Sequence, residues 1–484
     1  MITDHASAQT PRTILLTGGR APVTLELARL LHQAGHTVDV AESLPQQLCA
    51  RSKAVRQSFV VPPPRQQPQA YIQELMRIVK QQRIDILVPT CEEIFYVAHG
   101  LEQLRQVCEV LVPPATMLQS LHHKGEFIRL VHAAGLDAPD TMVIHNRQQW
   151  EKVQHGEWSS LLAASCSVQD LNAASDLPSV YTSRSLVFKP AYSRFASKVI
   201  MPAQDMTDDP ASAGEQNERS PSAVIAAPDG LSEQEPWIAQ AYVPGEQLCT
   251  YSIVYEGTIV AHATYQSRYR SSEAGASVHF EALDRPDTLV WVQQLVQQWN
   301  KEACSVDSSS VPHQTNNADA SIASESPIRT LSARTFSGQL SFDLIQERQT
   351  GKLYPIECNP RATSGIHLFT GADGLDMAIV APQLLVEQGK VITPQPGRRV
   401  MLTLPMLTSG WGRRWSGRQW KEWLKAMKGA QDAVFRWQDM MPFFGQFALV
   451  LAVVRISRRE QITVTQALTH DIEWNGQPPE RSDV

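Results

Sequence analysis

Hydrophobic and polar residues alternate over residues 340–346, LSFDLIQ, with two leucines and a phenylalanine on one side of the alternation. A period of two predicts a β-strand that buries one face. The letters QTGK at 349–352 supply turn-forming residues, and a second strand pattern covers residues 353–358. Together the three segments predict a β-hairpin.

This hairpin brings two carboxylates together if it is centred on Thr350, because Asp343 then faces Glu357. Directly opposed residues have Cβ atoms ~4.5–5.5 Å apart, and like charges there are destabilising. The pair therefore needs a proton or a cation between its members. Glu357 and Asn359 point the same way, and oxygen ligands of this kind suit Mg²⁺. We predict a metal site formed by Asp343, Glu357 and Asn359, with the planar cation of Arg361 placed for phosphate.

Residues 13–40 follow the pattern strand, turn, helix, turn, strand, which predicts a βαβ unit in a parallel sheet. Asp39 lies 21 residues after Gly18, as the acid of an NAD site would. However, the letters GGRAPV lack the G-x-G-x-x-G spacing that lets the backbone approach a pyrophosphate. We therefore favour a structural or substrate-facing turn and keep NAD binding as the weaker alternative.

The following residues continue the same predicted sheet, with a helix over 71–82 and a strand over 84–90. Glu92 and Glu93 come after this strand, at the carboxyl end, where open α/β sheets bind ligands. The acidic first turn of a helix explains them equally well. The sequence leaves these two alternatives open.

The hairpin also carries a resemblance to a known family. The letters FD at 342–343 and IECNPR at 356–361 resemble the metal-binding hairpin of the ATP-grasp superfamily, which holds the magnesium ions of ATP. Residues 11–115 resemble the pre-ATP-grasp domain of carbamoyl-phosphate-synthase-like and biotin-carboxylase-like enzymes. The resemblance implies a mixed α/β and α+β fold. Its parts would be a Rossmann-like parallel sheet, an ATP-grasp domain of two α+β subdomains at 116–375, and a C-terminal α+β domain at 376–484.

The resemblance further implies two lysines at the phosphates of ATP. Lys124 leads an apolar helix face that continues through Phe127, Ile128 and Val131. Lys189 closes the apolar strand SLVFKP and resembles the lysine of the family's V-x-K-P strand. Without the resemblance, the two lysines would be a solvated helix end and an ordinary strand end. With it, we predict that both contact ATP.

Other predicted nucleotide contacts also come from the resemblance. Segment 237–243 resembles the hinge that contacts adenine through backbone amides, and Glu246 matches a position that often touches the ribose. Segment 191–198, AYSRFASK, stands where most members carry a glycine-rich lid, yet it contains no glycine. We predict that Ser193 and Arg194 replace part of the lid's contacts. The predicted nucleotide-binding set is Lys124, Lys189, Gln240, Ala241, Tyr242, Val243, Glu246, Ser193 and Arg194.

Two further arginines, Arg268 and Arg270, share one face of a predicted strand by the period of two. In the resembled family this strand lines the reaction centre, where a basic pair could hold a carboxylate or a phosphate. Two solvated strand charges remain the alternative. Together with Arg361 they form the predicted catalytic set.

Composition narrows the class of protein. The 484 residues suggest about three domains, and the net charge of −6 argues against nonspecific binding to nucleic acid. Seven scattered cysteines without C-x-x-C favour a reduced, cytoplasmic chain without structural zinc, and no signal peptide is expected. Residues 203–234 and 304–328 are rich in small and polar residues and predict exposed insertions.

The C-terminal residues 376–484 are expected to form a separate layer. Ser416 and Gln419 predict a capping box at the start of a helix. The most apolar run, 440–454, is shorter than the ~20 residues of a membrane span, so we expect no span. We expect this run to pack on the substrate side as strand or helix. The chain end DIEWNG, 471–476, receives no role.

Taken with the resemblance, these residues predict an ATP-dependent ligase that uses Mg²⁺, with Mn²⁺ as an alternative. ATP would phosphorylate a carboxylic acid to an acylphosphate, an amine-bearing substrate such as an amino acid would attack it, and ADP and phosphate would be released. A homodimer stays open. The alternative from another class is an ATP-binding regulatory protein without turnover, which the glycine-free lid favours. An NAD oxidoreductase comes third.

Overall fold

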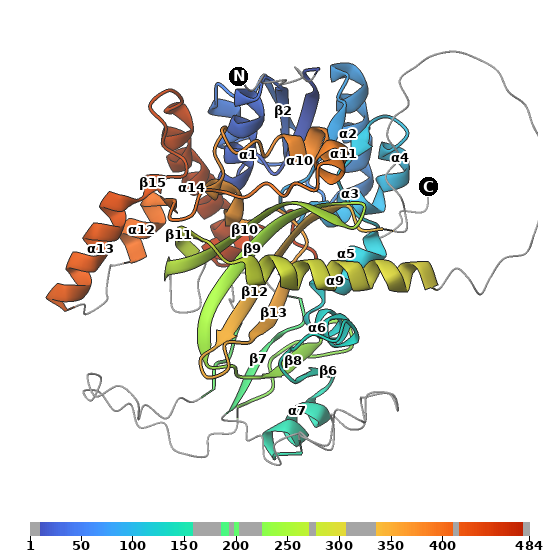
Figure 1. Ribbon diagram of the computed structural model, residues 1–484, viewed down its shortest axis with the longest axis vertical. Coiled ribbons are helices and arrows are strands. Elements are labelled where there is room, and N and C mark those ends of the chain that lie inside the picture. Colours follow the sequence, from blue (N-terminus) through green and yellow to red (C-terminus); the bar gives the residue numbers. More distant parts are fainter. Residues whose placement is uncertain are drawn as a thin grey trace, which may run out of the picture.

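In the computed structural model, the described residues form three β-sheets arranged along its long axis, with helices packed against them (Figure 1). The N-terminal sheet lies at the top of that view, the central sheet lies below it, and a small sheet lies at the bottom. The predicted insertions fall largely outside the described residues, as do Ser193 and Arg194. The structure describes residues 10–157, 185–192, 198–202, 225–270, 277–305, 335–409 and 416–477.

The N-terminal sheet is parallel and has the strand order β3-β2-β1-β4-β5, which confirms the predicted βαβ unit. Continuous apolar strands and proline at the first turns of the two long helices explain these elements. The elements are β1 (Thr13–Thr17), α1 (Pro22–Gln33), β2 (Thr37–Glu42), η1 (Cys49–Arg51), β3 (Gln57–Val60), α2 (Pro68–Gln82), β4 (Ile86–Val88), α3 (Ile94–His99), α4 (Leu101–Leu104) and β5 (Glu109–Val110).

The glycine turn after β1 has a structural explanation. Gly18 has a φ of 81°, and a Cβ there would lie 2.7 Å from Oγ1 of Thr90. The acid that an NAD site would need, Asp39, is bound instead by both ends of the Arg56 guanidinium. The geometry therefore favours the structural turn over the NAD alternative.

The small sheet is antiparallel, with the order β6-β8-β7. It packs on α7 through a core that contains Trp150, Phe188 and Trp237. Two helices connect it to the N-terminal sheet. The elements are α5 (Ala115–His122), α6 (Lys124–Ala133), β6 (Thr141–Ile144), α7 (Arg147–Gln154), β7 (Leu186–Pro190) and β8 (Trp237–Ala241).

The central sheet has seven strands in the order β13-β12-β9-β10-β11-β14-β15. Its β9–β10 hairpin turns at Glu256 and Gly257, whose φ values are 44° and 78°, in the left-handed region that tight hairpin turns use. Helix α9 packs against one face, and η5 packs against the other. The elements are β9 (Gly245–Tyr255), β10 (Thr258–Arg270), β11 (Ser277–Leu283), α9 (Pro286–Ser305), β12 (Gly338–Glu347), β13 (Leu353–Asn359), η5 (Ser364–Leu368), α10 (Met377–Val380), α11 (Pro382–Glu387), β14 (Arg399–Met401) and β15 (Gln431–Asp432).

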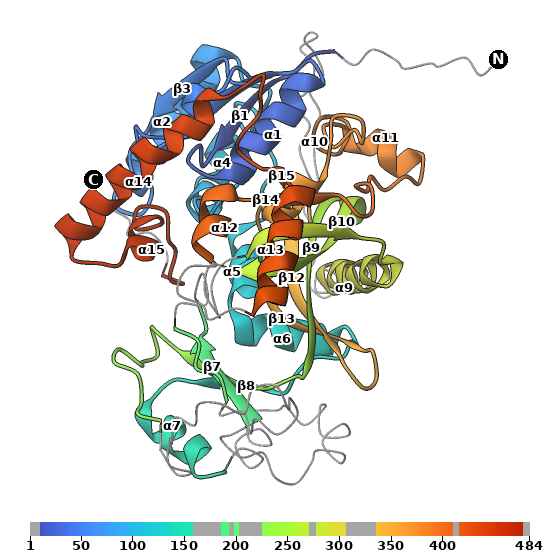
Figure 2. The same ribbon diagram turned by 90° about the vertical axis from the view of Figure 1, so that its left-hand side faces the viewer.

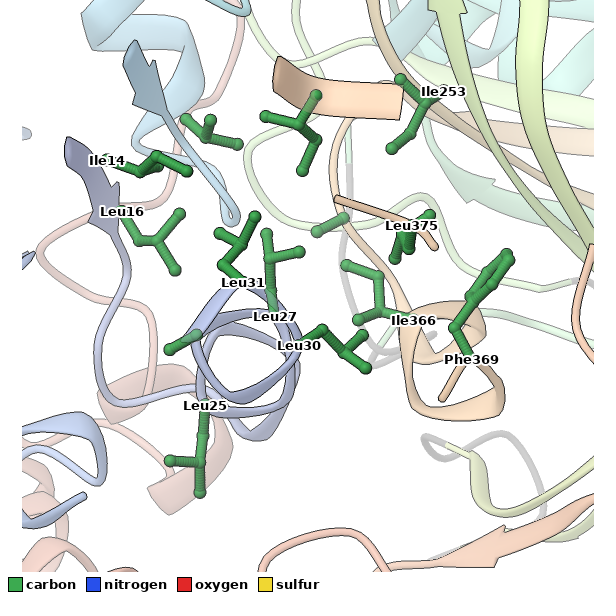
Figure 3. Packing of buried hydrophobic residues seen from close by; sticks show 14 of the residues in the cluster. Ile14, Leu16, Leu25, Leu27, Leu30, Leu31, Ile253, Ile366, Phe369 and Leu375 are labelled. Carbon is green, nitrogen blue, oxygen red and sulfur yellow. The ribbon is translucent and has the colours of Figure 1, made fainter. Parts of the chain in front are cut away.

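One continuous core joins the N-terminal and central sheets. Leu27 and Leu31 of α1 share it with Ile366 and Phe369, at and just after η5, and with Ile253 of β9 (Figure 3). Burial of apolar side chains from both sheets in one core fixes their relative position. Any site between them is therefore held by rigid elements.

The C-terminal residues do not form a separate layer, because β14 and β15 extend the central sheet. The domain boundary at residue 376 stays a prediction. The capping box of α13 is confirmed at Ser416 and Gln419. The apolar run forms a helix, α14, which packs on η1 of the N-terminal unit (Figure 2). The remaining elements are α12 (Thr403–Ser409), α13 (Gly417–Gly429), α14 (Met441–Glu460) and α15 (Val464–Ala467).

Candidate active site

Asp343 of β12 and Glu357 of β13 are direct partners across the antiparallel ladder, which confirms the predicted pairing. The reason differs in one detail. On the side of this pair that is nearer the turn, Leu344 faces Pro355. This part of the hairpin is therefore centred half a residue before Thr350. A bulge between Asp343 and Leu344 shifts the register and brings the two carboxylates opposite each other.

The two carboxylates have opposite pKa shifts. Burial and the neighbouring charge of Glu357 raise the pKa of Asp343. Burial would also raise the pKa of Glu357, but the charges of Lys124 and Lys189 outweigh it and lower that pKa. The pair therefore favours one proton or one cation between its members.

The two predicted lysines converge on Glu357. Lys124 begins α6, is buried, and places Nζ 3.5 Å from Oε2 of Glu357. Lys189 lies on β7, and its Nζ donates to the carbonyl of Ile356 at 2.9 Å. Burial lowers the pKa of Lys189 to about 8, and Lys124 adds to that shift. A backbone hydrogen bond of 3.1 Å from Lys124 to the carbonyl of Ala191 ties the two elements together.

Asn359 and Arg361 extend the same edge of β13. The amide of Asn359 donates to Oε1 of Glu357 at 3.2 Å and accepts from Nη2 of Arg361 at 3.0 Å. Nη1 of Arg361 donates to the carbonyl of Ala362. The structure thus brings Asp343, Glu357, Asn359, Arg361 and both lysines into one cluster.

The arginine pair on β10 is not one unit, contrary to the prediction. The β10–β11 ladder shifts register on both sides of Tyr269, which breaks the period of two. Arg270 acts electrostatically on Asp343, whereas Arg268 acts on Tyr269 and His279. Arg270 therefore belongs to the electrostatic surroundings of the carboxylate pair.

The predicted adenine-side residues lie at the end of the small sheet. Gln240 is buried, and its amide donates to Oγ1 of Thr141 at 2.8 Å. Ala241 ends β8, Tyr242 and Val243 follow it, and Glu246 lies exposed on β9. Their contacts to a nucleotide stay a prediction.

Two buried groups beside the carboxylates were missed by the sequence. Cys249 pairs with Asp343 across the β9–β12 ladder, and burial and that charge raise the pKa of its thiol. Burial, Lys124 and Arg361 lower the pKa of His122, so its imidazole is neutral near pH 7. Neither residue carries a motif, and only the fold brings them here.

The chain end also reaches this region. Trp474 is buried and stacks on Phe95 with ring centroids 4.6 Å apart. Its ring also contacts Tyr192, which follows Lys189 and the end of β7, at 5.4 Å. A Cβ on Gly476 would overlap the Tyr192 ring, so glycine is required there. The segment DIEWNG is therefore a structural part of the site's surroundings.

Glu92 and Glu93 turn out to have internal partners. The carboxylate of Glu93 accepts hydrogen bonds from Thr17 Oγ1 and from the backbone N–H groups of Thr90 and Cys91. The carboxylate of Glu92 accepts from the N–H of Trp474 at 3.3 Å. These two acids hold the turn and the chain end in place.

The residues at the carboxylate pair fit a magnesium-bound nucleotide phosphate. Two carboxylates and an amide offer oxygen ligands, and two lysines and an arginine surround them. Among the described residues, no three His, Cys, Asp or Glu side chains form a ready metal cage. Such a set would hold Mg²⁺ jointly with phosphate oxygens.

The order of sheets, the paired carboxylates and the two lysines from separate elements agree with the family resemblance. No family model matches the sequence, and no curated protein matches it either.

Several solved structures are similar to this chain over most of its length. N5-carboxyaminoimidazole synthetase from Staphylococcus aureus has 12% identity and a TM-score of 0.46, with 81% of each chain covered. An L-amino acid ligase from Bacillus licheniformis has 12% identity and a TM-score of 0.47, covering 81% of this chain and 79% of that one. Biotin carboxylase from Campylobacter jejuni has 10% identity and a TM-score of 0.45, covering 76% and 70%. At these values their substrates and activities do not transfer to this chain.

Proposed function

We propose that this protein is an ATP-dependent carboxylate–amine ligase that forms an amide through an acylphosphate and releases ADP and phosphate. The observation that carries the proposal is the convergence of Asp343 and Glu357 with the buried lysines Lys124 and Lys189. The lysines come from elements that the fold brings together, and all four side chains meet at one edge of β13.

The proposed chemistry needs positioning and charge rather than a side-chain nucleophile. In phosphoryl transfer, negative charge spreads over the transferred group, and fixed cations stabilise it. Lys124, Lys189 and Arg361 are held for that task by α6, β7 and β13. Mg²⁺ bound by the carboxylates would neutralise charge on the terminal phosphates. Arg270 is the better of the two β10 arginines to hold an acid substrate, because it acts on Asp343.

The proposed substrates are a small carboxylic acid and an amine, for example an amino acid. We also propose a cytoplasmic location, which is supported by the described cysteines that form no disulfide: Cys49, Cys91, Cys108, Cys249 and Cys358. The alternative function, an ATP-binding regulatory protein without turnover, rests on the glycine-free lid sequence.

The test combines a substrate screen with product analysis. Purified protein, ATP and Mg²⁺ are incubated with sets of acids and amines, nucleotides are resolved by chromatography, and hydroxylamine traps an acylphosphate. We expect ADP that depends on an acid, a hydroxamate with that acid, and no AMP. AMP as the main product would refute the proposed chemistry. ATP binding without any turnover would support the regulatory alternative.

A matched lysine pair makes the test specific to the site. Lys189→Met replaces a buried cation with an uncharged side chain of nearly the same length. Lys352→Met makes the same change at an exposed lysine that pairs with Asp137. A charge-assisted contact is worth ~1.5–3 kcal/mol, so Lys189→Met should weaken ATP binding by about tenfold or more. Lys352→Met should leave it unchanged. Equal dissociation constants for ATP in the two variants would exclude Lys189 from the site.

A further inference from the structure

Helix α14 carries an apolar face that no described part of the chain covers. Large apolar side chains follow one another at steps of three or four residues along it, and a tryptophan precedes it. Their exposed fractions lie between 41% and 79%. The stripe consists of Trp437, Met440, Met441, Phe444, Phe447, Val450 and Leu451. We propose that this stripe docks the protein on the surface of a membrane that contains anionic phospholipids.

The opposite face of the helix fixes how it can meet a bilayer. Leu449 and Val453 are buried in the core shared with α1 and β1. A Cβ on Gly445 would lie 2.9 Å from the Arg51 side chain, so the helix also fits closely against η1. Of the described helices, α14 alone is long and apolar enough to cross a membrane. Because one face is packed on the protein, the helix would lie in the interface plane instead of spanning it.

Charge around the stripe indicates what covers it. Arg51 and Lys53 lie exposed beside its first half, where the N–H of Lys53 donates to Asp439. Arg455, Arg458 and Arg459 are exposed at the C-terminal end of the helix, with Glu460 as the exposed acid among them. A chain with a net charge of −6 thus has cations at both ends of this apolar stripe. An apolar face flanked by cations matches acyl chains and anionic headgroups.

A cavity next to the stripe adds a second observation. It has a volume of about 660 Å³, and Trp437 and Lys53 are among its lining residues. Arg398 also lines it, and the Nε of this arginine is buried without a hydrogen-bond partner in the described residues. Four arginine or lysine side chains and three carboxylates line this cavity, and an excess of one cation next to the apolar stripe is compatible with the headgroup of an anionic lipid.

Charge also argues against a second copy of this chain as the occupant. In an antiparallel pair of α14 helices, Arg455 and Arg458 of one copy would approach the end of the stripe where Arg51 and Lys53 lie on the other. In a parallel pair, each of these cations would face the same residue of the other molecule. Both arrangements bring like charges together, which an anionic surface avoids.

The experiment is co-sedimentation of the full-length protein with lipid vesicles. Vesicles with equal parts phosphatidylglycerol and phosphatidylcholine are compared with vesicles of phosphatidylcholine alone. We expect binding that is about tenfold or more tighter to the anionic vesicles and that weakens with added salt. Binding that is absent, or equal on both vesicles, would overturn the proposal.

Variants separate the stripe from the rest of the surface. The double variant Phe444→Ser and Phe447→Ser and the double variant Arg455→Gln and Arg458→Gln should each lower anionic binding by about tenfold or more. Val60→Ser is the matched control, because Val60 is 56% exposed on β3 and lies outside the stripe. All replaced side chains are exposed, and thermal unfolding checks that each variant is folded.

Light scattering without lipid tests the second-copy alternative. We expect Phe444→Ser with Phe447→Ser to leave the oligomeric state unchanged. A wild-type dimer that this variant dissociates would show that another copy covers the stripe and would overturn the proposal. The proposal does not depend on ATP turnover, so its failure would leave the proposed ligase function untouched.

Discussion

Two buried groups of charges in this protein differ in how their charges are balanced. In the first, the guanidinium of Arg20 lies between Glu42 and Asp471 and also donates to Ser43 and to the carbonyl of Leu468. In the second, Asp343 and Glu357 face each other while two lysines crowd one of them.

The pKa shifts express this difference. The two carboxylates around Arg20 raise its pKa, although its burial works in the opposite direction, so the charged forms stabilise one another. At the hairpin, the pKa of Asp343 is raised and that of Lys189 is lowered, whereas the two lysines lower the pKa of Glu357, so the charged form is not favoured at every member of the group. We call the Arg20 group matched, because its opposite charges balance and stabilise the fold. We call the hairpin group unmatched, because its charges do not balance, which makes it a candidate ligand-binding site.

The largest expected effect comes from removing the side chain of Trp474, which lies in the chain end that Asp471 joins to Arg20. Trp474→Ala removes a buried ring that stacks on Phe95 and contacts Tyr192. Loss of such a ring costs ~3–5 kcal/mol, so the free energy of unfolding should fall by about that amount. Urea unfolding measures it. Trp437→Ala, at a tryptophan that is 79% exposed, should cost about 1 kcal/mol or less.

Trp474→Phe distinguishes packing from a more specific role, because it keeps a ring on Phe95. We expect it to recover most of the free energy of unfolding that Trp474→Ala loses. If Trp474→Ala unfolds at the same urea concentration as Trp437→Ala, the packing of the chain end does not stabilise the fold around the Arg20 group.

The hairpin can be predicted well because the residues that determine it lie close together in the sequence. Alternation, a turn and two opposed acids lie within twenty residues, so their pairing follows from the period of two. The lysines were found only through the resemblance, because a lysine at a helix start or strand end has many explanations. Their approach to Glu357 depends on the hydrogen bond from Lys124 to Ala191.

The features that could not be predicted depend on contacts between residues that are far apart in the sequence. The bulges on either side of Tyr269 separate Arg268 from Arg270, and no letter in the strand marks them. The bond between Arg20 and Asp471 joins residues 451 positions apart. The exposed side of α14 also follows from the tertiary packing of Leu449 and Val453 and not from its apolar composition.

The next largest effect tests the unmatched group. Glu357→Gln keeps the shape of the side chain but removes the charge that pairs with Lys124 and opposes Asp343. We expect ADP formation to fall about 100-fold or more, as for the loss of one preorganised charge at a reaction centre. The free energy of unfolding should change by less than ~1 kcal/mol, because lost attraction and lost repulsion offset each other.

The control for this change is Glu387→Gln, which removes an exposed carboxylate from α11. It should leave the rate of ADP formation unchanged. A Glu357→Gln protein that turns over ATP like the wild type would move the site away from the hairpin. A large loss of stability would instead place this pair among the matched charges.

The smallest expected effect is a pH dependence of stability at Asp471. Burial works to raise the pKa of Asp471, but hydrogen bonds and charge from Arg20, together with Ser43, hold it below its ordinary value. The folded protein therefore binds this proton less readily than the unfolded chain. The resulting stability is fully present above the unfolded pKa of ~3.9 and is lost as the pH falls through the folded pKa.

Asp471→Asn keeps a hydrogen-bonding side chain but removes the titration. At pH 7 the variant should be less stable than the wild type by ~1.5–3 kcal/mol, the value of a charge-assisted bond. This difference should shrink as the pH is lowered below about 4, because the wild type then loses its own charge. Urea unfolding at several pH values measures both, with the exposed Asp284→Asn as the control. A difference that stays constant from pH 7 to pH 3 would show that the contact of Asp471 with Arg20 does not depend on charge.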